Sequence, residues 1–241
     1  MGTRNLTCVI QNGEFKVAQY GQWDGYPTGQ GNTILGFLQK WNRKKFEKNL
    51  GKCQWIDTIK LEEMWKAAGA GTDGLISCEK ANEFGDKYPQ FDRDTGADIL
   101  SFIQKQTGSE PILLQDSRNF ASDSLFCEWA YVLNLDKDNL EIYKGFRCSP
   151  TKTGRFKDYT PRTHERGNTY YPIKLYRKYK FTELPEQFSG ETLPKHFPLT
   201  RHKNVKTSSL EPRAQKARAG HSRARVATAK NKQDNGRRRK R

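Results

Sequence analysis

The sequence predicts an α+β fold with a mainly antiparallel sheet, packed helices and a disordered basic C-terminal tail. Two pairs of alternating apolar segments, each pair flanking a short turn, predict β-hairpins. Helical spacing of apolar residues predicts helices between the two hairpins. No strand–helix–strand unit recurs, so local antiparallel pairing should dominate. A layered α-β-β-α arrangement is one form that such a fold can take.

The first half of the chain predicts a hairpin followed by three helices. Residues 6–10 and 15–20 flank Asn12-Gly13, a pair that tolerates the positive φ angles of a tight turn. A glycine-rich loop over residues 21–31 then leads to Asn32, a residue type favoured as a helix N-cap. Helices are expected from there through residue 41, over residues 43–50 and over residues 58–68.

The second half predicts one more helix, a second hairpin and a last strand. Asp94 and Thr95 are typical of a capped helix start, before apolar residues at helical spacing. Residues 126–135 and 140–143 flank a polar turn and predict the hairpin. Residues 173–181 alternate in a period of two, which predicts a strand with one charged face.

Charge and aromatic content divide the chain into two parts. All 28 aromatic residues lie in residues 1–200, the predicted globular domain, whereas residues 201–241 contribute +13 of the net charge of +16. A segment with so little apolar surface cannot offset the entropy of ordering, so residues 201–241 should be disordered when free. Within the domain, residues 147–200 form a basic, aromatic extension of residues 1–146.

Several classes of protein are excluded by composition. No apolar run is long enough for a membrane span, and no secretory core follows Met1. The five cysteines lack the short spacing of zinc or redox sites, and the few histidines are dispersed, so we expect no metal and no cofactor. The protein should be cytoplasmic, or nuclear if its source is eukaryotic, because the basic C-terminus resembles a nuclear-import signal.

Two N-terminal motifs carry a resemblance to a known group of proteins. Residues 2–7 read G-T-R-N-L-T, and residues 19–27 read Q-Y-G-Q-W-D-G-Y-P. Residues 93–97 and 126–132 supply two later blocks. Together they resemble an uncharacterised family found in phages, bacteria and fungi, over about residues 1–146. The resemblance implies a phage-like origin and no particular activity.

The loop after the first hairpin is the candidate ligand site. Trp23, Asp24 and Tyr26 lie at the end of a strand, where loops often carry function. Asp24 could act as a base, with Arg4 or Glu128 as its catalytic partner. Turn formation explains the same residue types, with Trp23 filling the core.

The alternative function built on this loop is a small-molecule hydrolase or transferase with an N-terminal-nucleophile-hydrolase-like fold. Such enzymes need Cys, Ser or Thr as the first mature residue, whereas removal of Met1 here exposes Gly2. We therefore assign no catalytic residue and expect a non-enzymatic accessory protein.

The basic segments favour nucleic acid as a partner. Lys174, Lys178 and Lys180 sit on the last strand beside tyrosines, so that phosphates could meet lysines while bases stack on rings. An edge strand protected by lysines would look the same.

The tail should bind nucleic acid, or another polyanion, non-specifically and in a salt-sensitive way. A tail that only improves solubility, and a protein partner, are also compatible with its charge. The tail residues assigned to binding are Arg223, Arg225, Arg237, Arg238, Arg239, Lys240 and Arg241.

Overall fold

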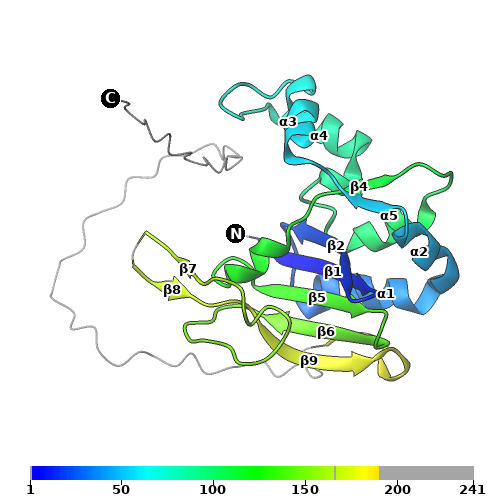
Figure 1. Cartoon of the computed structure of the whole chain (residues 1–241), viewed down its shortest axis with the longest axis vertical. Helices are drawn as coiled ribbons and strands as arrows, with labels where there is room; N and C mark the ends of the chain where they lie inside the picture. The colour runs from blue at the N-terminus through cyan, green and yellow to red at the C-terminus, as the bar shows by residue number, and fades with distance from the viewer. Residues whose placement is uncertain (1, 166, 190–241) are drawn as a thin grey trace, which may run out of the picture.

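The computed structural model describes residues 2–165 and 167–189, which are built around a five-stranded sheet (Figure 1). Its strands are β1 (Asn5–Gln11), β2 (Glu14–Gly21), β5 (Trp129–Asn134), β6 (Asn139–Lys144) and β9 (Lys174–Lys180). They run in the order β2-β1-β5-β6-β9, and every neighbouring pair is antiparallel except β1 and β5. The predicted α+β class with a mainly antiparallel sheet is confirmed. The predicted disordered tail, residues 201–241, lies outside the described residues.

Both predicted hairpins are present. At the turn between β1 and β2, φ is 56° at Asn12 and 76° at Gly13, as a type I′ turn requires. The carboxylate of Asp136, in the turn of the second hairpin, accepts hydrogen bonds from the backbone N–H of Asn12 (2.7 Å) and Gly13 (2.8 Å). These bonds join the two turns, and they support the parallel pairing of β1 with β5, which the sequence did not predict.

Helices cover one face of the sheet, which we call the helical face. They are α1 (Asn32–Lys40), α2 (Arg43–Leu50) and α5 (Ile99–Lys105). Their apolar residues pack against alternate residues of β1, β5 and β6 in the larger core. Among the buried residues of this core, Val9, Tyr131 and Ile142 come from the strands, and Leu35 and Leu100 come from the helices. Burial of this apolar surface is the main favourable term for the fold.

The opposite face of the sheet, which we call the loop face, is covered mainly by loop segments. The 3₁₀ segment η4 (Arg118–Ser122) packs over it, together with Phe156, Tyr159 and Ile173 from the segment between β6 and β9. Cys8, Val132 and Tyr143 of the sheet meet Phe156 and Ile173 of this cover. The described residues form one large sheet and two two-stranded sheets, so a stacked pair of large sheets, as α-β-β-α layering needs, is not found in this part of the chain.

A smaller cluster lies beyond the β2 edge of the sheet (Figure 1). Helices α3 (Thr58–Ala67) and α4 (Cys78–Lys87) and the turn η2 (Pro89–Phe91) bury Leu61 and Phe84 together. A parallel pair of short strands, β3 (Cys53–Trp55) and β4 (Ile112–Leu114), connects this cluster to the rest. The second two-stranded sheet is the hairpin of β7 (Arg162–Thr163) and β8 (Thr169–Tyr170), which projects from the end of the main sheet at left in Figure 1.

The predicted helices are present, but two of their starts differ from expectation. The side chain of Asn32 does not cap α1, because the π-helical turn η1 (Pro27–Gly31) runs directly into it. Asn32 instead accepts a hydrogen bond from the backbone N–H of Phe188 (2.6 Å). After Asp94, the 3₁₀ turn η3 (Gly96–Asp98) precedes α5, and the N-cap residue of each element makes no capping hydrogen bond with its side chain.

Strand β9 contains a bulge that changes which side chains share a face. Tyr143 pairs with Leu175 and Ile142 pairs with Arg177, so Tyr176 has no partner in the register. A bulge reverses the alternation of side chains beyond it. Lys174 therefore points to one face of the sheet, whereas Lys178 and Lys180 point to the other. The predicted strand is present, but the bulge removes its single charged face.

The side chain of Glu141, in the middle of β6, holds the cover of the loop face in place. Glu141 is 3 % exposed and accepts hydrogen bonds from Tyr143 Oη (2.7 Å), Arg155 Nε (2.9 Å) and Arg155 Nη2 (3.1 Å). Lys178 Nζ of β9 lies 3.4 Å away. Burial alone would raise the pKa of Glu141, but these hydrogen bonds and the charges of Arg155 and Lys178 together hold it below its ordinary value.

Replacing Glu141 should make the protein less stable in a pH-dependent way. Glu141→Gln leaves the partly buried Arg155 without its counter-ion and should lower the free energy of unfolding by about 3 kcal/mol at pH 7. Because the pKa is lowered by folding, this contribution is present above the unfolded pKa of about 4.5. It disappears as the pH falls from there through the folded pKa. Urea unfolding between pH 3 and pH 7 measures the difference.

The control is Glu14→Gln, which removes an exposed ion pair with Lys16. Its unfolding free energy should stay close to that of the unmodified protein. A Glu141→Gln protein whose deficit stays constant down to pH 3 would contradict the role given to the carboxylate.

Candidate functional site

The predicted ligand loop is fastened to the start of β1 and to β5. The backbone N–H of Gly25 donates to the carbonyl of Thr3 (2.8 Å), and the hydroxyl of Tyr131 donates to the carbonyl of Gly25 (2.8 Å). The side-chain amide of Asn5 donates to the carbonyl of Trp23 (3.2 Å). With three separate anchors, the loop is a fixed part of the fold.

The three predicted ligand-binding residues are exposed on this loop. Trp23 is 45 % exposed and Tyr26 is 52 % exposed, so the expectation that Trp23 fills the core is wrong. The indole N–H of Trp23 donates to the carboxylate of Asp94 (2.7 Å). Asp24 adopts φ 51°, and its backbone carbonyl accepts a hydrogen bond from Gln30 (2.8 Å). The loop thus presents two rings and a carboxylate to the outside.

The catalytic candidates are not gathered into one site. Arg4 lies over the ring of Phe126, with 4.7 Å from its guanidinium carbon to the ring centre. Partial burial raises the pKa of Glu128, although the hydrogen bond and charge of neighbouring Arg4 oppose the shift. In the described part of the chain, no hydrogen bond or ion pair joins Asp24 to either residue.

The lysines predicted to hold phosphates lie on an edge strand and on two faces of it. Lys178 is 3.4 Å from Glu141, and Lys180 pairs with Glu183 of the following 3₁₀ turn η5 (Phe181–Glu183) at 3.0 Å. The neighbouring rings of Tyr176 and Tyr179 pack against the larger core. Lysines that protect an edge explain this arrangement better than a stacking surface on β9.

A row of aromatic rings runs across the end of the sheet where β1 and β5 begin. Tyr20 contacts Phe120 at 5.0 Å between ring centres, and Arg4 bridges from Tyr20 to Phe126. Phe126 contacts His164 at 5.4 Å. The ring of Tyr170 lies 5.5 Å from that of His164 and 6.0 Å from that of Phe146, measured between ring centres. We call this set the aromatic row; its rings are Phe120, Tyr20, Phe126, His164, Tyr170 and Phe146.

The hairpin of β7 and β8 is held against the row by polar contacts. His164 Nε2 lies 3.1 Å from the carboxylate of Asp123. Two residues earlier, Arg162 Nε donates to the hydroxyl of Ser122 (3.1 Å). The two bonds attach the start of β7 and the residue that follows this strand to the end of η4.

Phe146, at the far end of the row, is both strained and exposed. Its φ of 59° lies in the left-handed region, which a bulky side chain rarely adopts. Its ring is 54 % exposed, so core packing does not explain why Phe occupies this position. Strain that the surrounding structure maintains at an exposed residue is typical of functional sites.

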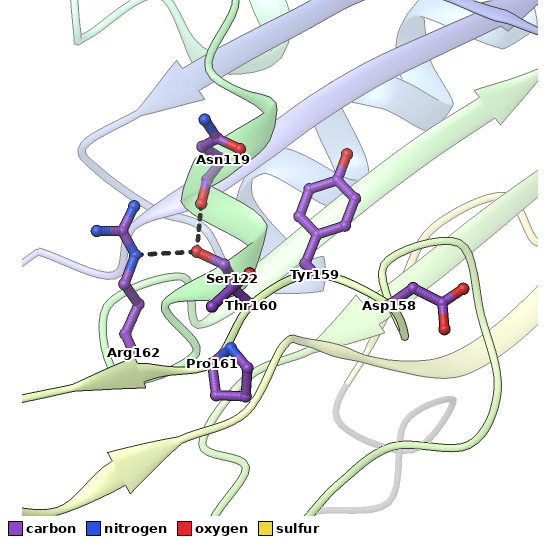
Figure 2. Close-up of a pocket in the computed structure, with 7 residues that line it drawn as sticks. All are labelled: Asn119, Ser122, Asp158, Tyr159, Thr160, Pro161 and Arg162. Carbon is purple, nitrogen blue, oxygen red and sulfur yellow. Dashed lines mark hydrogen bonds between the residues drawn. The ribbon is translucent and has the colours of Figure 1, made fainter.

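A pocket of about 550 Å³ lies beside the row, between η4 and residues 158–162. Figure 2 shows Arg162 and Asn119 on one side of it and Asp158 on the other, with Tyr159 and Pro161 between them. The loop residues Trp23, Asp24 and Tyr26 do not line this pocket.

Sequence reasoning missed Tyr20, Phe120, Phe126 and His164 as members of one surface. They come from distant segments, and only the parallel pairing of β1 with β5 brings those segments together. No group of three or more His, Cys, Asp or Glu is placed to hold a metal ion within residues 2–165 and 167–189. Every described helix is too short or too polar to cross a membrane.

Comparison with protein families, curated proteins and solved structures found no match. The resemblance to the family with the G-T-R-N-L-T and Q-Y-G-Q-W-D-G-Y-P motifs therefore stays a prediction.

The anchoring of the ligand loop can be tested with two glycine substitutions. A side chain at Gly25 would lie 2.7 Å from the backbone carbonyl of Thr3, so Gly25→Ala should destabilise the protein by about 2 kcal/mol or more. Gly36, inside α1, faces open space, and Gly36→Ala should stabilise by about 0.5–1 kcal/mol. Chemical denaturation measures both. Equal effects of the two substitutions would show that the loop is not held as described.

Proposed function

We propose that this protein is a non-enzymatic accessory protein that binds nucleic acid, with single strands held on the aromatic row. The observation that carries the proposal is the row itself, in which Phe126 (37 % exposed) and Phe146 (54 % exposed) present rings to solvent. Each base that stacks on an aromatic ring contributes about 1–3 kcal/mol, whatever its identity. Bases are available for such contacts in a single strand and not in a duplex.

Positive charge beside the rings supports the same partner. Arg4 lies against Phe126, Arg147 follows Phe146 in the chain, and Arg162 begins the strand β7, which His164 follows. A single strand needs cations at the spacing of its phosphates and rings at the spacing of its bases. The end of the sheet offers both kinds of group.

Residues 201–241 would attract nucleic acid electrostatically, without preference for its sequence or strandedness. Their net charge of +13 would release condensed counter-ions from any nucleic acid, which makes binding sequence-independent and salt-sensitive. In this proposal the tail attracts any polyanion, and the aromatic row selects single strands over duplexes. Such a protein would act in the cytoplasm, or in the nucleus of a eukaryote.

The alternative, a hydrolase or transferase at the Trp23–Tyr26 loop, has weaker support. Asp24 has no described contact with Arg4 or Glu128, and the pocket of about 550 Å³ is lined by other residues. The raised pKa of Glu128 is the one observation in its favour, and partial burial explains that shift.

Removal of residues 201–241 should abolish low-salt binding to duplex DNA. Affinity of the full-length chain should fall by about 10³ or more between 50 mM and 200 mM salt, as expected for several phosphate contacts. Fluorescence anisotropy of a labelled duplex measures both proteins. The control, Lys60→Ala with Lys66→Ala on α3, removes charge elsewhere and should bind as the full-length chain does. Equal binding after truncation would contradict the role of the tail.

Substitutions in the row should weaken binding to single strands specifically. Phe126→Ala should lower the affinity for an oligothymidine by about tenfold, the loss of one stacked base. Phe146→Gly should lower it similarly while leaving stability unchanged or higher, because glycine relieves the positive φ. Duplex binding and the salt dependence should change little for both.

The matched control is Ile59→Ala, since Ile59 is 68 % exposed on α3, away from the row. It removes an exposed apolar side chain without touching the proposed surface, so single-strand binding should stay the same. If Ile59→Ala and Phe126→Ala weaken binding equally, the row is not the binding surface.

A further inference from the structure

The pocket between η4 and residues 158–162 offers several polar groups without partners. Arg162 uses Nε to bind Ser122, and within the described residues no contact occupies its two terminal nitrogens. The side-chain amide of Asn119 and the hydroxyl of Tyr159 are likewise unbonded to other described groups. Polar groups around a cavity of this size are typical of a site for a polar small ligand.

Each of these groups matches one part of a nucleotide. The free edge of an arginine binds a phosphate through two N–H groups. An asparagine amide can both donate and accept, as the edge of a base requires. Tyr159 and Pro161 both line the pocket, and the ring of Tyr159, which points toward η4, provides an apolar wall for a base or sugar (Figure 2). On the opposite side, the carboxylate of Asp158 can accept hydrogen bonds from hydroxyl or amino groups.

The mixed charge of the pocket lining favours a ligand that carries hydrogen-bond donors as well as an anionic group. Asp158 lines the pocket opposite Arg162, and its one described ion pair is with Lys157 at 2.6 Å. A small anion on Arg162 would make no favourable contact with the carboxylate of Asp158. A ligand with a phosphate at one end and hydrogen-bond donors at the other satisfies both sides.

The pocket is continuous with the aromatic row along two elements. On η4, Asn119 of the pocket precedes Phe120 of the row. On the β7 side, Arg162 of the pocket lies two residues before His164 of the row. A nucleic-acid strand that stacks on the row therefore passes close to the pocket.

From this placement we infer that the pocket binds one nucleotide unit, with its phosphate on Arg162 and its base against Tyr159. The inference rests on the proposed function, because the unit is part of the single strand held on the row. The same chemistry would accept a free mononucleotide, and the experiment distinguishes the two sources.

Photo-crosslinking of the full-length protein tests the pocket directly. An oligothymidine with single 4-thiothymidine substitutions is irradiated in complex with the protein, and crosslinked peptides are mapped by mass spectrometry. Crosslinks to Tyr159 are expected from one position, with crosslinks to Phe126 or Phe146 from neighbouring positions. Arg162→Ala should reduce the Tyr159 crosslink by about fivefold or more, the loss of one charge-assisted contact. Lys60→Ala is the matched control and should leave it unchanged.

The outcomes separate the pocket from the proposed function. If the oligonucleotide binds and crosslinks only outside residues 157–162, the pocket inference is wrong and the row remains supported. If the oligonucleotide does not bind, the proposed function fails and the inference fails with it. Loss of the Tyr159 crosslink on addition of thymidine 5′-monophosphate, but not of inorganic phosphate at equal ionic strength, would show that a free nucleotide also occupies the pocket.

Discussion

The buried carboxylate of Glu141 is the interaction on which the functional surface depends. It gathers Tyr143, Arg155 and Lys178, and so ties β6, β9 and the cover of the loop face to one point. A buried charge with partners from three segments is costly to separate, because each partner would be left desolvated. The segment that carries Arg162, His164 and Tyr170 continues from that cover, and the contacts of Arg162 with Ser122 and of His164 with Asp123 hold it in place. The basic, aromatic extension of residues 147–200 thus contributes a strand and core residues within its described part.

Much of the fold could be predicted from local patterns. Asn12-Gly13 predicts its turn because few residue pairs adopt two positive φ angles. Helices α2 and α3 follow from apolar spacing and from Gly51 and Gly69, the glycines at their ends. The parallel pairing of β1 with β5 could not be predicted, since it joins strands that lie far apart in the sequence. The bulge at Tyr176 could not be predicted from the sequence for a different reason. A strict alternation in sequence gives no sign of a residue that lacks a partner on the neighbouring strand.

The site was predicted only in part. The exposed Trp23 and Tyr26 lie where a loop at a strand end was expected, and Arg4 lies near Glu128. The aromatic residues of the sequence predicted a surface on which bases stack, and the prediction put that surface on β9. There, Tyr176 and Tyr179 instead pack against the larger core. The row uses rings that are isolated in sequence, and the positive φ of Phe146 is a property of the folded backbone alone. Neither feature has a local signature in a single sequence.

The parallel pairing has a consequence for how the chain folds during synthesis. Strands β1 and β2 leave the ribosome early and can form their hairpin at once, because that contact is local. The other side of β1, however, stays unpaired until residues 129–134 have been made. Throughout that interval one edge of an apolar strand has unpaired backbone groups, and such an edge can pair with a wrong partner.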